Sequence, residues 1–132
     1  MPVEPNSEQI AEIQSIAGGP DDDPLVMLNL NRYRDPEAYA RYGEVAQRVL
    51  ERVGGRILWH APVRGTVVGE GEEHFDDVIA VWYPSAAAFL QLAGDPELLG
   101  ARDHRLEGLE RAALLRCEGA AQPVLGAPEA AT

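Results

Sequence analysis

The segment 25–43 joins an apolar strand directly to an amphipathic helix, and this junction constrains the fold more than any other part of the sequence. Its first seven residues alternate in character, and one side is wholly apolar, with Val26, Leu28 and Leu30. The pair Asp35–Pro36 follows, in which the carboxylate suits a helix N-cap and the proline suits the first helical position. The segment therefore predicts a β–α unit whose strand is covered on its apolar side.

The same plan recurs later in the chain. A second strand-then-helix pair occupies 78–92, and a strand or bent hairpin is expected over 56–60 and 66–69, broken near Pro62 and Gly65. One or two helices are expected over 95–109, and a last strand over 112–117. Without a short N-terminal helix the order is βαββαβ. Right-handed crossovers place both long helices on one face of one antiparallel sheet. The sequence predicts an α+β fold, a ferredoxin-like sandwich with an extra N-terminal helix.

The domain organisation follows from this plan. We expect an N-terminal helical appendage over 1–24, a single domain over 25–118, and a disordered tail over 119–132, which holds Ala, Pro and Gly without an apolar period. No apolar run approaches the ~20 residues of a membrane span, and no secretory signal precedes the domain. Together with the single cysteine, Cys117, these features predict a cytoplasmic protein.

Charge and composition exclude several functional classes. Acidic residues outnumber basic ones 22 to 11, so the net charge of −11 disfavours nucleic acid as a partner. All of the basic residues are arginine, which removes Schiff-base chemistry, pyridoxal-phosphate attachment and a P-loop lysine. The three histidines are scattered and form no metal motif, so neither a metal nor a cofactor is expected.

Strand parity predicts a small-molecule site. If helices cover the side of Val26, the opposite side presents Asn29, His60, Trp82 and Arg116 within an apolar surface. His60 could then serve as a base, Asn29 or Arg116 as the donor to an oxyanion, and Trp82 as a stacking surface. The alternative is that this face is a dimer interface and that its polar groups pair across a twofold axis.

Three further residues are candidates for ligand contact. Tyr39 and Tyr42 lie on the apolar stripe of the first long helix, where core packing is the simpler interpretation and a hydroxyl group reaching a ligand is the alternative. Arg105 is interpreted either as a member of a surface ion pair or as an anion clamp at the mouth of the site.

Several short motifs resemble those of the small dimeric α/β-barrel proteins. The motifs are Met27–Leu30, Asp35–Tyr39, Val81–Ser85 and Gly94–Glu97, and the similarity covers about 25–118. The nearest branch resembles a bacterial family of unknown function, with antibiotic-biosynthesis monooxygenases as distant relatives. The resemblance implies a homodimer with a small cavity between sheet and helices or inside the barrel. Trp82 stands where that pattern often has a carboxylate, so a carboxylate role at this position is in doubt.

Two functional hypotheses follow. In the first, the homodimer is an enzyme, a cofactor-independent monooxygenase, isomerase or cyclase that binds a small aromatic or polyketide-like molecule, with His60 and Asn29 as catalytic residues. In the second, it is a non-catalytic dimeric module that binds a metabolite or serves as an accessory subunit. The sequence does not decide between enzyme and module.

Overall fold

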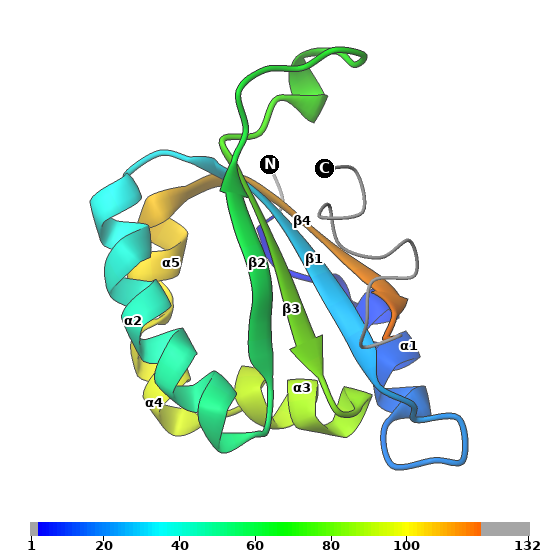
Figure 1. Ribbon diagram of the computed structural model, residues 1–132. Coiled ribbons are helices and arrows are strands. Elements are labelled where there is room, and N and C mark those ends of the chain that lie inside the picture. The colour runs from blue at the N-terminus through cyan, green and yellow to red at the C-terminus, as the bar shows by residue number, and fades with distance from the viewer. Residues whose placement is uncertain (1–2, 120–132) are drawn as a thin grey trace, which may run out of the picture.

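Strand β1 (Leu25–Tyr33) lies inside a four-stranded antiparallel sheet of order β2-β3-β1-β4 in the computed structural model, which describes residues 3–119 (Figure 1). The other strands are β2 (Arg56–Pro62), β3 (Asp77–Tyr83) and β4 (Leu109–Glu118). The helices are α1 (Ser7–Ile16), α2 (Pro36–Arg52), α3 (Ala86–Ala93), α4 (Pro96–Gly100) and α5 (Arg102–Gly108), with a 3₁₀ turn, η1 (Gly71–Glu73). The predicted βαββαβ fold with an extra N-terminal helix is confirmed.

Side-chain caps start the helices where the sequence predicts them. Asp35 Oδ1 accepts hydrogen bonds from the backbone N–H groups of residues 37 and 38, at 3.1 and 3.3 Å, and Pro36 is the first residue of α2. Ser85 caps α3, and Asp95 caps α4. These bonds satisfy amides that the helix itself cannot pair, so each β–α junction is encoded locally.

The side of β1 that the helices cover is the opposite of the predicted one. Leu25, Met27 and Asn31 are buried beneath α2 and α5, whereas Val26 and Leu28 are only half-buried. Successive residues of a strand point to opposite faces, so a one-residue error in parity exchanges the two sides completely. The prediction was wrong because β1 is apolar on both sides over most of its length, and the two asparagines on the helix side suggested exposure.

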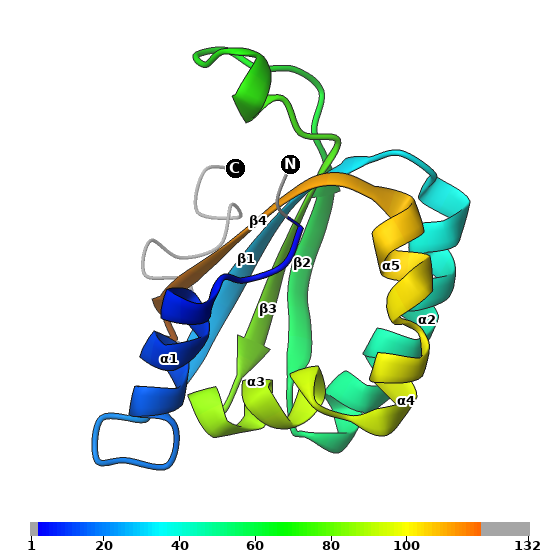
Figure 2. The same ribbon diagram turned by 180° about the vertical axis from the view of Figure 1, so that it is seen from behind.

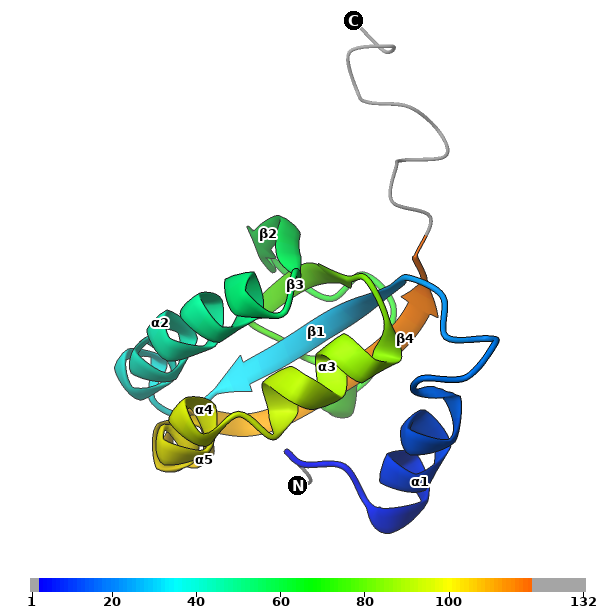
Figure 3. The ribbon, with the colours of Figure 1, turned by 90° about the horizontal axis from the view of Figure 1, so that it is seen from below.

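No helix within residues 3–119 covers the other face of the sheet, which we call the open face. Seen from below in Figure 3, the helices α2 to α5 lie on the same side of the strands. The apolar members of the open face, taken from the strand register, are Val26, Leu28, Leu30, Trp59, Val78, Ala80, Trp82, Ala113 and Leu115. Met27 and Leu114 point to the helix side.

Helix α1 extends the helical layer past β4, at the edge away from α2 (Figure 2). Its Ile13 and Ile16 pack against the core, and the following loop is fixed by Asp22, whose carboxylate accepts the N–H groups of Ala86 and Ala87 at 2.5 and 3.2 Å. The N-terminal segment is thus packed onto α3. None of the helices in residues 3–119 is long and apolar enough to cross a membrane.

Near the C-terminal end of the described residues, the side chain of Cys117 lies on the open face and is exposed in the single chain. The tail predicted over 119–132 lies outside the described residues apart from Gly119.

Two glycines in the helical layer give a matched stability test. A Cβ on Gly108 would lie 2.6 Å from the backbone nitrogen of Tyr39, so Gly108→Ala should push α5 from α2 and lower the free energy of unfolding by about 1–3 kcal/mol. Gly43 lies inside α2 with no atom near its would-be Cβ, so Gly43→Ala should raise this free energy by about 0.5–1 kcal/mol. Urea denaturation measures the free energy of unfolding of both variants. If the two substitutions changed it by the same amount, the close contact between Gly108 and Tyr39 would be contradicted.

Candidate functional site

The buried carboxylate of Asp77 forms the centre of a polar cluster on the helix side of the sheet. The Tyr33 hydroxyl group donates a hydrogen bond of 2.5 Å to Asp77 Oδ2. His60 Nε2 lies 2.5 Å from Asp77 Oδ1, off the line of an ideal hydrogen bond. The Asp77 side chain is 11% exposed and that of His60 is 52% exposed. The carboxylate is therefore held inside the protein while the imidazole reaches solvent.

Strand register brings these groups together. Asp77 pairs with Asn31 on β1 and with Pro62 on β2, and His60 is placed two residues before Pro62, on the same side of the sheet. Backbone contacts fix the return of the chain into β3, because Asp76 N donates to Asn31 O at 2.8 Å and Asp76 Oδ2 accepts from Tyr33 N at 2.9 Å. The cluster therefore belongs to the sheet itself and not to a loose loop.

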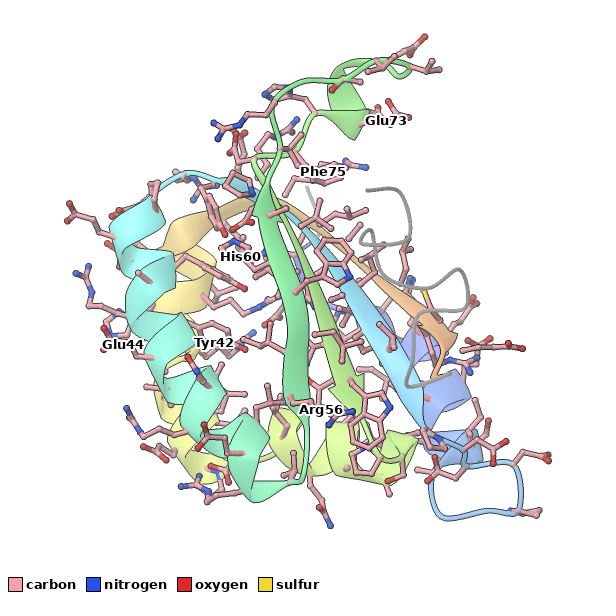
Figure 4. All side chains as sticks on the ribbon, viewed as in Figure 1. Tyr42, Glu44, Arg56, His60, Glu73 and Phe75 are labelled. Carbon is pink, nitrogen blue, oxygen red and sulfur yellow. The ribbon has the colours of Figure 1, made fainter. Side chains whose placement is uncertain are left out.

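Three tyrosine rings continue the cluster towards α2. The ring centroids of Tyr33 and Tyr39 lie 5.1 Å apart, and those of Tyr39 and Tyr42 lie 5.6 Å apart. The buried Asn31 amide donates a long hydrogen bond of 3.5 Å to the Tyr39 hydroxyl group. Tyr42 points from α2 towards the sheet, as Figure 4 shows. Both predicted tyrosines thus pack in the core and border the Asp77 cluster.

Burial keeps these phenols protonated. Removal from water is the largest cause of the raised pKa of Tyr33, and its hydrogen bond to Asp77 adds to it. Burial raises the pKa of Tyr39 to about 12 and also raises that of Tyr42, although the positive charge of Arg105 lowers both. Arg105 is half-buried on α5 and so influences the phenols electrostatically. Each phenol therefore remains a hydrogen-bond donor at neutral pH.

The structure separates the other predicted site residues. Trp82 lies on the open face, where the Arg56 guanidinium group stacks over its ring at 5.1 Å. Arg116 lies on the helix side, but three strand spacings, about 14 Å, and a shift of two residues along the strand separate it from His60. Its guanidinium group is 3.7 Å from Glu12. The expectation that all four residues share one face was wrong, because Trp82 pairs with Val26 on the open face, whereas Asn29, His60 and Arg116 lie on the helix side.

Asn29 lies on the same side as His60, but its amide is already engaged. Its Nδ2 atom donates to the carbonyl groups of Met27 and Ile79, at 3.2 and 3.3 Å. Both N–H groups are thus used within the sheet, and only its oxygen is available to a ligand. Its catalytic role stays a prediction, and the geometry offers Tyr39 as a donor in its place.

Sequence reasoning missed Asp77, Tyr33 and Asn31. A usable signal was present, because Asp77 is a carboxylate at the first residue of an otherwise apolar strand, and such positions require a partner when they are buried. His60 on the preceding strand is that partner. No group of three or more potential metal ligands occurs within residues 3–119.

A separate concavity of about 340 Å³ lies at one end of the open face. It is mostly apolar and combines sheet residues with the connection between β2 and β3; its lining includes Leu30, Val67, Val68, Glu73, Phe75 and Val78. It is not lined by His60, so the polar cluster and this concavity occupy different faces of the sheet.

The tyrosines provide a pH test of this layer. All four tyrosines of the chain have raised pKa values, with burial as the largest cause in each, including Tyr83. An unfolded tyrosine ionises near pH 10, so the folded state binds more protons above that pH. The contribution of the tyrosines to stability should be fully present below about pH 10 and should be lost as pH rises towards the folded pKa values. In a titration with base, the absorbance of tyrosinate should appear together with unfolding. Ionisation of the tyrosines near pH 10 in the folded protein would contradict their raised pKa values.

Comparison with known proteins agrees with this architecture. RPA0582, a protein of unknown function from Rhodopseudomonas palustris, is 32% identical over 92% of this chain and 98% of its own, with a TM-score of 0.81. A putative antibiotic biosynthesis monooxygenase from Bacteroides thetaiotaomicron is 18% identical, over 80% of this chain and 96% of its own, with a TM-score of 0.52. Hydroxynitrile lyase from Passiflora edulis is 14% identical, over 77% and 99%, with a TM-score of 0.56.

The two distant matches show the fold alone, and the shared fold of the putative antibiotic biosynthesis monooxygenase fits the predicted distant relation. A comparison with curated proteins gives no match. The model of the family described as a domain of unknown function (DUF1330) matches residues 25–119. This is the region that the sequence analysis assigned to the folded domain, and the chain belongs to the DUF1330 family.

Proposed function

We propose that the protein is a cofactor-independent enzyme that removes a proton from carbon in a small aromatic or polyketide-like molecule. The observation that carries this proposal is the contact between the buried Asp77 carboxylate and the half-exposed His60. A carboxylate at Nε2 stabilises the tautomer with its proton on that nitrogen and leaves Nδ1 free to accept one. This arrangement is typical of an oriented general base.

The phenols supply the second element of such chemistry. Removal of a proton next to a carbonyl group leaves negative charge on the carbonyl oxygen, and a donor that stays protonated lowers the energy of this charge. Tyr39 meets that requirement, since its pKa is raised to about 12. Arg105 adds a positive charge close to the same phenols. In this scheme Tyr39 binds the oxyanion and Arg105 favours an anionic intermediate.

The proton balance of the step is simple. The C–H electron pair stays on the substrate as an enolate, and the proton moves to His60 Nδ1. An isomerase or cyclase would return that proton to another atom of the product, whereas a monooxygenase would let molecular oxygen react with the carbanion. The distant structural neighbours have names from different reaction classes, so the fold leaves this second step open.

Deuterium exchange tests the first step directly. Wild-type protein in D2O should speed the exchange of the acidic C–H protons of 2-tetralone, an activated aromatic ketone, above the buffer rate, as followed by proton NMR. His60→Ala should lower this catalysed rate by about a hundredfold. His60→Ala also removes one of the two partners of the buried Asp77 carboxylate and should lower the melting temperature, so circular dichroism must verify that the variant is folded at the assay temperature.

A matched control tests whether the loss of catalysed exchange is specific to His60 or follows from the removal of any histidine. His74→Ala removes an exposed imidazole from the connection between β2 and β3 and should leave the exchange rate unchanged. Equal rates for the wild type and His60→Ala would refute the assignment of His60 as the base.

We also propose that the protein is a homodimer that packs its open face against that of a second copy. The supporting feature is an apolar sheet face without a helical cover, because apolar patches of this kind usually mark an interface. Sedimentation velocity at micromolar concentration should give twice the mass of the 132-residue chain. A monomer under these conditions would refute this proposal.

The non-catalytic alternative has its own supporting observation. The concavity of about 340 Å³ on the open face is large enough for a small metabolite, and its walls are mostly apolar. A protein that binds 2-tetralone without speeding exchange would favour this metabolite-binding module over the enzyme.

A further inference from the structure

The connection between β2 and β3, residues 63–76, exposes two neighbouring apolar side chains completely. Val67 and Val68 are 98% and 91% exposed, whereas the next most exposed large apolar side chain within residues 3–119, that of Leu99, is 53% exposed. This connection, which we call the arm, rises beyond the end of the sheet, as the position of Glu73 in Figure 4 shows. Two adjacent valines left fully in water suggest a surface that another molecule covers.

Side-chain contacts hold the arm in a defined conformation. Arg32 Nη1 donates to the carbonyl groups of Gly71 and His74 at 2.9 and 3.3 Å, and its Nε lies 2.8 Å from a Glu110 carboxylate oxygen. The guanidinium group of Arg111 lies 5.9 Å from the centre of the Phe75 ring. Both arginines belong to the open face, so the arm is held to that side of the sheet. The exposure of the valines is therefore a consequence of a fixed conformation.

The charges of the arm and the open face are opposite. The tip of the arm carries the acidic residues Glu70, Glu72 and Glu73. The open-face positions of the four strands hold arginines and no carboxylate; Glu110 lies at the β-bulge and is paired with Arg32. Arg56 is exposed on this face at the end of the sheet opposite to the arm, as Figure 4 shows. An acidic, apolar arm thus complements the distant end of the same face.

A twofold axis perpendicular to the strands would satisfy this complementarity. Such an axis places the arm end of one sheet against the Arg56 end of the other, so that the same contact forms two times in the dimer. An axis parallel to the strands would instead bring two acidic arms together in a protein whose net charge is already −11. Charge therefore favours the first arrangement.

We propose that the arm of each protomer docks on the open face of a second copy of this chain, with Val67 and Val68 covering Trp82 and the acidic tip facing Arg56. The inference rests on the proposed homodimer and adds which segment clasps the partner and in which orientation. The partner would also cover the mouth of the 340 Å³ concavity, since Val67 and Val68 form part of its wall.

Sedimentation equilibrium of the full chain tests the clasp. The double variant V67D/V68D should raise the dimer dissociation constant by at least about tenfold, because it would bury carboxylates in an apolar contact. The control is Leu99→Asp, which changes a 53% exposed apolar residue on α4, in the helical layer, and should leave the constant unchanged. Circular dichroism verifies that each variant is folded.

A charge exchange tests the orientation. Arg56→Glu and Glu72→Arg should each weaken the dimer, and the double variant R56E/E72R should recover most of the loss, because it restores opposite charges across the axis. A wild-type monomer would refute the homodimer itself. A wild-type dimer that V67D/V68D leaves unchanged would refute the clasp alone, and single charge variants without recovery in the double variant would refute the orientation.

Discussion

Strand β1 forms hydrogen bonds to both β3 and β4, and the identity of its helix-facing side chains determines what the rest of the structure can do. Leu25 and Met27 pack with Val49 and Leu50 of α2 in the main core, so the apolar area removed from water holds the helices to this side. The same side ends at Asn31 and Tyr33, which places polar groups at one end of the helix–sheet interface. The core and the candidate site are therefore two ends of one surface.

At the polar end, the buried Asp77 requires compensation. A carboxylate removed from water is costly unless it accepts hydrogen bonds or faces a positive charge, and here it contacts the Tyr33 hydroxyl group and the His60 ring. The two contacts have different consequences. Tyr33 is shared with the tyrosine layer and fixes the carboxylate, while His60 lies on the edge strand and faces solvent. The cluster therefore differs from an ion pair buried in the core, because one of its members, His60, is accessible from solvent.

On the opposite side, the sheet lacks a helical cover, and the chain instead places a charged arm and several apolar residues there. The arginines of this face stand out in a protein with twice as many acidic as basic residues. Two of them, Arg32 and Arg111, hold the arm, and Arg56 stacks on Trp82. The open face thus differs from the rest of the surface in polarity and in the sign of its charge, which are the properties that favour pairing with a second copy.

The sequence alone determined the elements, because their signals are local: Asp35 and Pro36 start α2, Ser85 starts α3, and the order of strands and helices predicts a one-sided sheet. It also identified His60, Tyr39 and Tyr42 as residues of interest. Only the tertiary structure decided which side of β1 the helices cover, since both sides are largely apolar and a shift of one residue exchanges them. The pairing of β3 with β1 and β2 placed Trp82 and His60 on opposite faces, since Trp82 pairs with Val26 and Arg56 while His60 pairs with Ile79. The same pairing brought Asp77 to the imidazole and to Tyr33, which lies 44 positions away in the sequence. Local patterns carry no information on such pairings, because the free energy that selects them comes from burial across the whole sheet.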